Sequence, residues 1–350
     1  MSPRPTIADV AALAGVSRAT VSFVLNGRPG VAAATQERVR AAAAQLRWNP
    51  SRTARALSTG RARAVGLVLT REPELIGVDP FYPAFIAGVE SVISQSGDGL
   101  MLQMCGPENE VETYRRLAAD RRVDGVLLTD LRVDDPRPAL VGELGLPAVA
   151  VGGREGAADL PTVNLDDRLV VADAVRHLVD LGHRRIAYVA GPLEYRHARR
   201  RRQAWAEALS DTGLPLGLVL PGGFTAAGGA HATQMLLSYA KPPTAIMYAN
   251  DLSATAGMAA AQAAGLDLPR DLSVVGFDDI SLASWTRPSL TTCRADATSW
   301  GSSSARTLME LIEHGTAGDV EMEPAALVVR SSTGLVPTPG SRAEGAAHGG

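Results

Sequence analysis

Apolar positions recur at helical spacing in three short segments of the first fifty residues. Ile7, Val10, Ala11 and Ala14 define one face, and Gly15 follows it as a helix-ending glycine does. A second helix is expected from 18 to 25, and a third from about 35 to 47. Two helices joined by a tight turn that contains glycine are typical of a helix-turn-helix, whose second helix enters the DNA major groove. An ordinary helical corner in an unrelated domain is the alternative.

Cap residues support the first two helices. Thr6 stands at the N-cap position, and Asp9 three residues later can complete a capping box. Ser17 can cap the second helix. The inward positions expected for the second and third helices are Val21, Val24, Leu25, Val39, Ala42, Ala43 and Leu46. Because this core is small and rich in alanine, we expect it to be only modestly stable alone.

From Ala64 onward, short apolar runs alternate with amphipathic stretches. The runs, expected as strands, are 64–70, 99–105, 124–129, 146–151, 185–191, 244–249 and 272–277. The stretches, expected as helices, lie near 84–96, 110–120, 168–181, 198–212, 226–239, 252–264 and 298–314. Nearly continuous apolar strands separated by helices indicate parallel sheets covered on both faces. The pattern therefore predicts one or two doubly wound α/β domains after the all-α head.

Charge divides the chain in the same way. The net charge is only −3, which by itself argues against a nucleic-acid binder. However, residues 1–63 contain ten arginines against Asp9 and Glu37, and the remainder contains 24 basic and 35 acidic residues. A basic head on an acidic body is expected when only the head meets phosphates.

Composition also bears on the cellular compartment in which the protein is expected. No apolar run approaches the roughly 18 residues of a membrane span, and the N-terminus lacks the apolar core of a secretory signal. Cys105 and Cys293 are far apart in the sequence and have no metal-ligand residues at suitable spacing, so buried thiols are expected. We therefore expect a cytoplasmic protein without membrane contact, metal or cofactor.

Sequence motifs along nearly the whole chain resemble the LacI/GalR family of bacterial transcriptional repressors. They are T-I-x-D-V-A at 6–11, A-G-V-S at 14–17, T-V-S at 20–22, V-L-N at 24–26, N-P at 49–50, A-R-A-L at 54–57, L-G-H-R-R-I at 181–186, V-V-G-F-D-D-I at 274–280 and P-S-L-T-T at 288–292. The resemblance implies an all-α helix-turn-helix head plus an α/β body similar to periplasmic binding proteins, with two doubly wound parallel-sheet lobes and a ligand cleft between them.

Domain boundaries follow from the resemblance. Residues 1–48 would form the DNA-binding head and 49–63 a hinge helix, whose alternative is a solvated linker. Residues 64–337 would form the effector-binding domain, with lobe one at about 64–162 and 293–323 and lobe two at about 163–292 and 324–337. The tail, 338–350, is rich in Gly, Ala, Ser and Pro and is expected to be disordered.

The residues expected to contact DNA lie mainly at the start of the second helix. They are Thr6, Ser17, Arg18, Ala19, Thr20, Ser22, Phe23 and Asn26 in the head, with Arg52, Arg55 and Leu57 in the hinge. Arg18 suits either a bidentate guanine contact or a phosphate. Leu57 matches the leucine that the family wedges into a minor-groove step. Ala19 and Phe23 depart from the Gln and Arg common in the family, so the operator sequence does not transfer.

The effector residues implied by the resemblance surround the cleft. They are Phe81, Thr129, Arg201, Phe224, Asn250, Asp278 and Trp285. Asp278 directly follows an apolar strand, which independently predicts a position at the cleft, while Asp279 is a candidate turn cap. Arg201 belongs to a run of four arginines whose ordinary interpretation is a solvated helix face. Gly152-Gly153-Arg154 replaces an Asp of many sugar-responsive members, so the ligand is expected to be a carbohydrate that is smaller, anionic or differently oriented.

These features favour a ligand-responsive repressor that reads a palindromic operator as a homodimer or a larger assembly. A solute-binding protein without a DNA role is the alternative, and the basic head argues against it. An enzyme on a doubly wound fold is a third hypothesis. His177, His183 and His197 have no paired nucleophile, and the sequence lacks a P-loop, a GxGxxG after a strand and a GxSxG motif. No catalytic residues are therefore expected.

Overall fold

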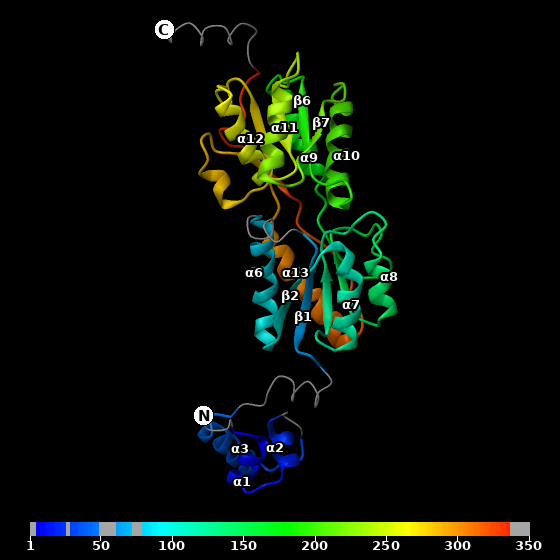
Figure 1. Cartoon of the computed structure of the whole chain (residues 1–350), viewed down its shortest axis with the longest axis vertical. Helices are drawn as coiled ribbons and strands as arrows, with labels where there is room; N and C mark the ends of the chain where they lie inside the picture. Colours follow the sequence, from blue (N-terminus) through cyan, green and yellow to red (C-terminus); the bar gives the residue numbers. More distant parts are fainter. Residues whose placement is uncertain (1–4, 26–28, 49–60, 72–78, 337–350) are drawn as a thin grey trace.

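A computed structural model of the chain describes residues 5–25, 29–48, 61–71 and 79–336. Three units follow one another along the long axis: a small helical head and two α/β lobes (Figure 1). The hinge residues 49–60 and the tail 338–350 lie outside the described residues, so the predictions made for them stay predictions.

The head consists of α1 (Ile7–Ala14), α2 (Arg18–Leu25) and α3 (Ala33–Gln45). The Thr6 amide donates to the Asp9 carboxylate at 2.7 Å, and Gly15 ends α1 in the left-handed conformation with φ 65°. The axes of α1 and α2 differ by 100°, as in a helix-turn-helix. Val10, Val21 and Val39 are fully buried where the three helices meet. The third helix begins two residues earlier than predicted, and Leu46 is its partly buried C-cap.

Lobe one is a parallel six-stranded sheet in the order β11-β5-β4-β3-β1-β2. Its strands are β1 (Ala64–Leu69), β2 (Gly99–Met104), β3 (Gly125–Leu128), β4 (Ala148–Val151), β5 (Thr162–Asn164) and β11 (Val320–Glu321). Its helices are α6 (Phe81–Ile93), α7 (Glu110–Ala119), α8 (Arg137–Glu143) and α13 (Ala297–His314). Separate apolar cores lie on the two faces, one beneath α6 and α13 and the other beneath α7 and α8.

Lobe two repeats the design with the strand order β12-β10-β9-β8-β6-β7. Its strands are β6 (Ile186–Ala190), β7 (Val219–Pro221), β8 (Ala245–Tyr248), β9 (Ser273–Asp278), β10 (Thr291–Arg294) and β12 (Ala326–Val328). Its helices are α9 (Arg168–Asp180), α10 (Arg196–Asp211), α11 (Ala226–Leu237) and α12 (Asp251–Ala263). Only the β10–β12 pair is antiparallel among these strands. As the alternation of apolar runs and helices predicted, each sheet is covered on both faces.

The chain crosses between the lobes three times, at 165–167, 295–296 and 322–325. Two boundaries therefore need correction. Asn164 lies on the lobe-one sheet and Arg294 on the lobe-two sheet, each on the opposite side from the predicted division. These strands hold only three or four residues and carry several polar side chains, so their sequences do not mark their ends.

All seven apolar runs form strands and all seven amphipathic stretches form helices. The elements that the pattern missed are β5, β7, β10, β11, β12 and α8. Each missed strand has at most four residues, and α8 has seven, which is too short for a periodic pattern. Of the two thiols, Cys293 is buried as expected, whereas Cys105 is only half-buried.

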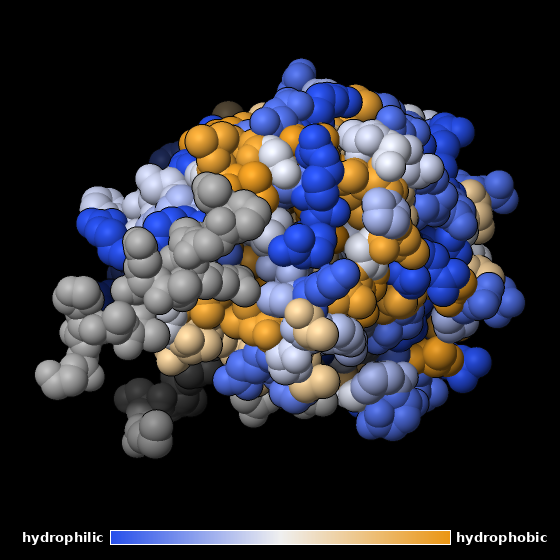
Figure 2. Space-filling model, turned by 90° about the horizontal axis from the view of Figure 1, so that it is seen from above, coloured by the Kyte–Doolittle hydropathy of each residue, from blue (hydrophilic) through white to orange (hydrophobic). Residues whose placement is uncertain are grey.

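Seen from the end of lobe two, hydrophilic and hydrophobic side chains are interspersed over the surface (Figure 2). Within the described ranges no single helix is long and apolar enough to cross a membrane. The sharply bent pair α1 and α2 reaches the required length and composition only when the two are taken together.

Candidate functional site

The start of α2 presents the DNA-contact candidates to solvent. Ser17, Arg18 and Ala19 are exposed, and Phe23 keeps 42% of its surface exposed. The Ser17 hydroxyl accepts the Thr20 amide at 3.1 Å, so Ser17 caps α2 as predicted. Ser22 is half-buried, and Thr6 is exposed at the start of α1. Asn26, Arg52, Arg55 and Leu57 lie outside the described residues.

A small inner cavity of about 60 Å³ lies between the lobes. Lobe one contributes Arg71, Asp79, Phe81, Thr129, Asp130, Val151 and Gly152, joined by Trp300 of α13, while lobe two contributes His197, Arg201, Phe224, Asn250 and Asp278. Six of the seven predicted effector residues therefore line one cavity. Most of them follow the carboxyl ends of strands, which is where α/β sheets bind ligands.

Trp285 is the exception. It ends the short 3₁₀ turn Ser281–Ser284 with 75% of its surface exposed and does not line the cavity. An aromatic ring is instead supplied by Trp300, whose indole N–H donates to the Val163 carbonyl at 2.9 Å. Trp300 reaches the cavity because α13 returns to lobe one, whereas Trp285 lies in the loop between β9 and β10.

Arg71 connects the lobes electrostatically. Its guanidinium donates twice to Asp130, at 2.7 and 2.9 Å, and the Tyr82 hydroxyl also donates to that carboxylate. Burial alone would raise the pKa of Asp130, but Arg71 holds it below its usual range. The same guanidinium lies 5.0 Å from the Tyr195 ring centre and 5.2 Å from that of Phe224, both in lobe two.

Arg201 is buried rather than solvated. Its Nε donates to Asp167 at 2.7 Å and its Nη1 to the Ala249 carbonyl at 3.1 Å, and the guanidinium stacks on the Phe277 ring at 3.4 Å. Burial works against ionised Asp167, yet Arg201 and Arg200 together lower its pKa. A run of arginines usually forms a solvated helix face. Arg201 departs from this expectation because it lies on the face of α10 that packs against the sheet of lobe two.

Asp278 faces the cavity with spare acceptor capacity. Within the described residues its carboxylate makes no hydrogen bond or ion pair. Burial raises the pKa of Asp278 well above its usual range, and Arg201 opposes this electrostatically. Its backbone φ of 114° is strained for a non-glycine residue, as is common at functional sites. Asp279 is not a cap: it accepts from Arg294 and Arg330, each at 2.6 Å.

Asp79 approaches from lobe one and is buried. Its carboxylate accepts the Phe81 amide at 3.1 Å and lies 3.8 Å from the Arg71 guanidinium. Burial raises its pKa as well. Asn250 already uses both polar atoms of its side chain. Its Oδ1 accepts the Ser253 amide as the N-cap of α12, and its Nδ2 donates to the Phe224 carbonyl. The cavity thus offers the carboxyl group of Asp278, unpaired among the described residues, the carboxyl group of Asp79 beside Arg71, and several aromatic faces.

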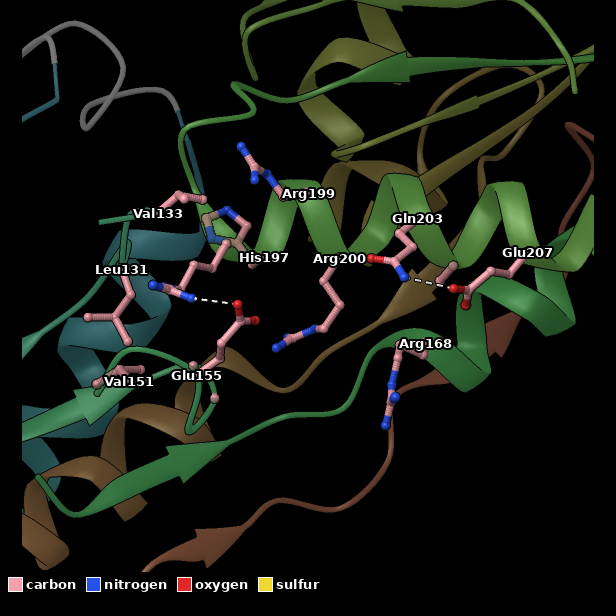
Figure 3. A pocket seen from close by; sticks show the side chains of 14 residues that line it. Leu131, Val133, Val151, Glu155, Arg168, His197, Arg199, Arg200, Gln203 and Glu207 are labelled. Atoms are coloured by element: carbon pink, nitrogen blue, oxygen red, sulfur yellow. Dashed lines mark hydrogen bonds and ion pairs between the residues drawn. The ribbon is translucent and has the colours of Figure 1, made fainter. Parts of the chain in front are cut away.

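An outer cavity of about 310 Å³ adjoins the inner one, and the two share Val151, Gly152 and His197. Figure 3 shows the residues that line the outer cavity. The His197 ring stacks between Tyr195 and Phe224, at 5.7 and 5.5 Å between ring centres. Burial lowers the pKa of His197 to about 3, so its ring is neutral. Nearby, the lobes pair through the Arg196 amide, which donates to Leu131, and the Val133 amide, which donates to Glu194, both at 2.9 Å.

Arg71, Asp130, His197 and Trp300 line the inner cavity but were not among the predicted site residues. The strand-end rule would have found Arg71 and Asp130, because they follow β1 and β3 by two residues. Nothing in the sequence marks His197 or Trp300, which lie on helices. His183 is fully buried and its ring nitrogens are hydrogen-bonded to Thr244 and Ser273, so it serves the core of lobe two. Among the described residues, no three His, Cys, Asp or Glu side chains could hold a metal ion.

Comparisons with known proteins decide the family. The profile described as bacterial regulatory proteins, lacI family, matches residues 6–51, and that of a periplasmic binding protein-like domain matches residues 175–333. The chain is 36% identical over 332 residues to the HTH-type transcriptional regulator CelR of Thermobifida fusca, covering 94% of this chain and 96% of that protein. This chain belongs to the LacI family. It is a DNA-binding transcriptional regulator, and the resemblance drawn from its motifs is confirmed.

Other LacI-family proteins are similar over the same span. CytR, a transcriptional repressor of Escherichia coli strain K12, is 32% identical and covers 95% of this chain and 97% of its own. A structure described as the CelR–cellobiose complex aligns with a TM-score of 0.73 and 34% identity over 94% of this chain and all of that chain. The lac repressor dimer bound to operator and the anti-inducer ONPF aligns with a TM-score of 0.83 and 29% identity over 95% of this chain and all of that chain. The predicted fold of a helix-turn-helix head with two periplasmic-binding-protein-like lobes is confirmed.

Proposed function

We propose that this LacI-family protein is a homodimeric repressor that binds a palindromic operator and releases or tightens its hold when a sugar binds between the lobes and contacts the inner cavity. One observation carries the proposal: residues from both lobes line that cavity. A ligand there contacts both lobes at once, so it favours one arrangement of the lobes over another. Different affinities for two arrangements are what coupling between distant sites requires.

The ligand class rests on the chemistry of the lining. Asp79 and Asp278 present acceptors from opposite lobes, and Arg201 is fixed by Asp167 with its guanidinium at the same cavity. Phe81 and Phe224 add flat apolar faces. Sugars combine hydroxyl groups with an apolar ring face, so this lining suits them. The CelR structure named for its cellobiose complex supports the same class.

The DNA side of the proposal rests on the head. We assign phosphate contacts to Ser17 and Thr20. Arg18, Ala19, Ser22 and Phe23 are assigned to base edges, and Thr6 lies just before the start of α1. The family motifs support the DNA contacts proposed for Asn26 and for the hinge residues Arg52, Arg55 and Leu57. The operator-bound lac repressor dimer supports two heads on one palindrome, with larger assemblies left open. Because operator DNA lies in the cytoplasm, we place the protein there.

The alternatives have less support. A solute-binding protein would need no helix-turn-helix head, yet the lacI profile covers residues 6–51. A repressor of this kind needs no catalytic step and no cofactor. Stoichiometric binding of a sugar without its turnover would distinguish such a repressor from an enzyme on the same fold.

The experiment uses the full-length protein and fragments of its own genome at moderate salt. We expect selective enrichment of palindromic sites and a change in operator affinity when an active sugar is added. Asp278→Asn should bind the operator but respond to the sugar at least tenfold more weakly, because the lost carboxylate accepted ligand hydroxyls. No palindrome enriched with or without sugars would overturn the proposal, and an unchanged response of the variant would remove Asp278 from the site.

A further inference from the structure

The outer cavity has no role in the proposed function, although it is the larger of the two. A cavity needs roughly 10–15 Å³ to hold one water molecule, so the inner cavity of about 60 Å³ holds only a few waters. That space suits one edge of a sugar ring. The outer cavity of about 310 Å³ has room for the rest of a larger ligand. Small-molecule sites usually measure roughly 300–1,000 Å³, a range that the outer cavity reaches and the inner cavity does not.

One face of α10 forms a wall of the outer cavity. Arg196, Arg200, Gln203 and Glu207 line it and recur at intervals of three and four residues, so they follow one side of the helix. Figure 3 shows Arg199, Arg200, Gln203 and Glu207 along this helix, with Glu155 and Arg168 across the space. A row of hydrogen-bonding groups thus extends away from the inner cavity.

Most of these charges are already neutralised. Arg196 pairs with Glu155 at 3.0 Å, Arg200 with Asp167 at 2.7 Å and Arg168 with Asp166 at 2.7 Å. The Gln203 amide donates to Glu207 at 2.8 Å. Paired groups offer both donors and acceptors at little net charge, which suits hydroxyl groups better than a phosphate or carboxylate.

The passage between the cavities is lined partly by glycine. Gly152 adopts φ +134°, and a Cβ atom there would meet nothing within 4 Å, so the space beside it is open. At Gly153 a Cβ atom would come within 3.0 Å of the Arg200 guanidinium. These are the positions where many sugar-responsive relatives were expected to carry a carboxylate. Without that carboxylate, a sugar chain has room to pass His197.

We propose that the effector is a neutral oligosaccharide of at least two rings, whose terminal ring reaches into the inner cavity while the next ring lies against Arg199, Arg200 and Gln203 of α10. This inference rests on the proposed sugar response. It adds a second subsite and a minimum ligand length, with Gln203 and Arg199 as specificity residues.

The test is calorimetric titration of the full-length protein with α- and β-linked disaccharides and trisaccharides of glucose, mannose and xylose, and with each monosaccharide. At least one disaccharide should bind tenfold or more tightly than its monosaccharide. In Arg199→Ala/Gln203→Ala this ratio should fall below about threefold. Arg202→Ala is the matched control, because Arg202 is exposed on the same helix and lines neither cavity, and it should keep the full ratio.

Three results would overturn the inference: no disaccharide binding, equal affinity for monosaccharides and disaccharides, or an unchanged ratio in the double variant. Tighter binding of glucose 6-phosphate than of every neutral sugar, lost in the double variant, would make the subsite anionic and also overturn it. The proposed function fails separately, when no operator is enriched or when no sugar changes operator binding.

Discussion

At the scale of single residues, neighbours decide what each charged side chain can do. Four consecutive arginines on α10 have different surroundings, since each residue turns the helix by about 100°. Arg199 and Arg202 are exposed, whereas Arg200 and Arg201 share the buried Asp167. The same principle separates Asp278, which faces a cavity, from Asp279, which is held by two arginines. Residue type alone therefore does not predict function in this protein.

The first prediction concerns Arg18 at the start of α2. If its guanidinium binds guanine, Arg18→Ala should weaken operator binding by about 1–3 kcal/mol and binding to random DNA by much less. Fluorescence anisotropy with operator and scrambled duplexes of equal length measures both affinities. Equal losses on the two duplexes would instead identify Arg18 as a phosphate contact.

The second prediction concerns Asp251, a fully buried carboxyl at the start of α12. Burial raises its pKa to about 7 from an ordinary 3.8, although the Thr292 hydroxyl and the Ile280 amide donate to it. Between these pH values the folded protein holds a proton that the unfolded chain releases. The free energy of unfolding should therefore fall as pH rises from about 4 to 7, by up to about 1.4 kcal/mol per pH unit.

Asp251→Asn should flatten this dependence. An amide can accept from Ile280 and donate to the Thr292 hydroxyl, so both hydrogen bonds have replacements. Urea unfolding at pH 5 and pH 7 compares the two proteins. A variant that loses as much stability over this interval as the wild type would show that Asp251 does not titrate there.

At the scale of elements, close backbone contact joins segments that are far apart in the sequence. The orange α13 lies beside the cyan α6 in lobe one (Figure 1). A Cβ atom at Gly88 would stand 2.0 Å from the Thr298 carbonyl oxygen, and one at Gly301 would stand 2.1 Å from the Phe85 carbonyl oxygen. Glycine on each helix therefore lets the two backbones touch. This contact fixes Trp300, and with it one wall of the inner cavity.

The third prediction follows from that contact. Gly88→Ala should destabilise the protein by about 1–3 kcal/mol, because α13 must move away. Gly142→Ala in α8 is the control: a Cβ atom there meets nothing within 4 Å, so the gain in helix propensity should stabilise by about 0.5–1 kcal/mol. Urea unfolding followed by circular dichroism measures both. Wild-type stability in Gly88→Ala would mean that the helices separate at no cost.

At the scale of the whole molecule, charge is separated along the chain. The arginine-rich first 63 residues precede a body in which acids outnumber bases. The body should repel DNA while the head attracts it, which favours binding through the head alone. The lobes meet at the cleft, so a ligand there acts on the body while the head contacts the operator.

The fourth prediction is therefore a steep salt dependence of operator binding. The logarithm of the association constant should fall linearly with the logarithm of salt concentration, with a slope of roughly −0.9 for each phosphate neutralised. Anisotropy titrations between about 50 and 200 mM salt measure the slope. A flat line would contradict the electrostatic role of the head.

The sequence by itself determined the head, the alternation of strands and helices, and the family. These depend on local spacing, caps and apolar runs, which the order of residues records directly. The family resemblance also led to six of the seven predicted effector residues that line the inner cavity, and Asp278 was predicted independently because it directly follows a parallel strand.

Only the tertiary structure decided the rest. It placed Trp300 rather than Trp285 at the cavity, buried Arg201 against Asp167, brought Arg71 across to the rings of lobe two and opened the outer cavity along α10. The shortest strands could not be predicted from the sequence either. A strand of two to four residues is held by its neighbours in the sheet and not by the β-propensity of its own residues. Contacts between distant segments depend on packing and shared charge, which no local pattern encodes.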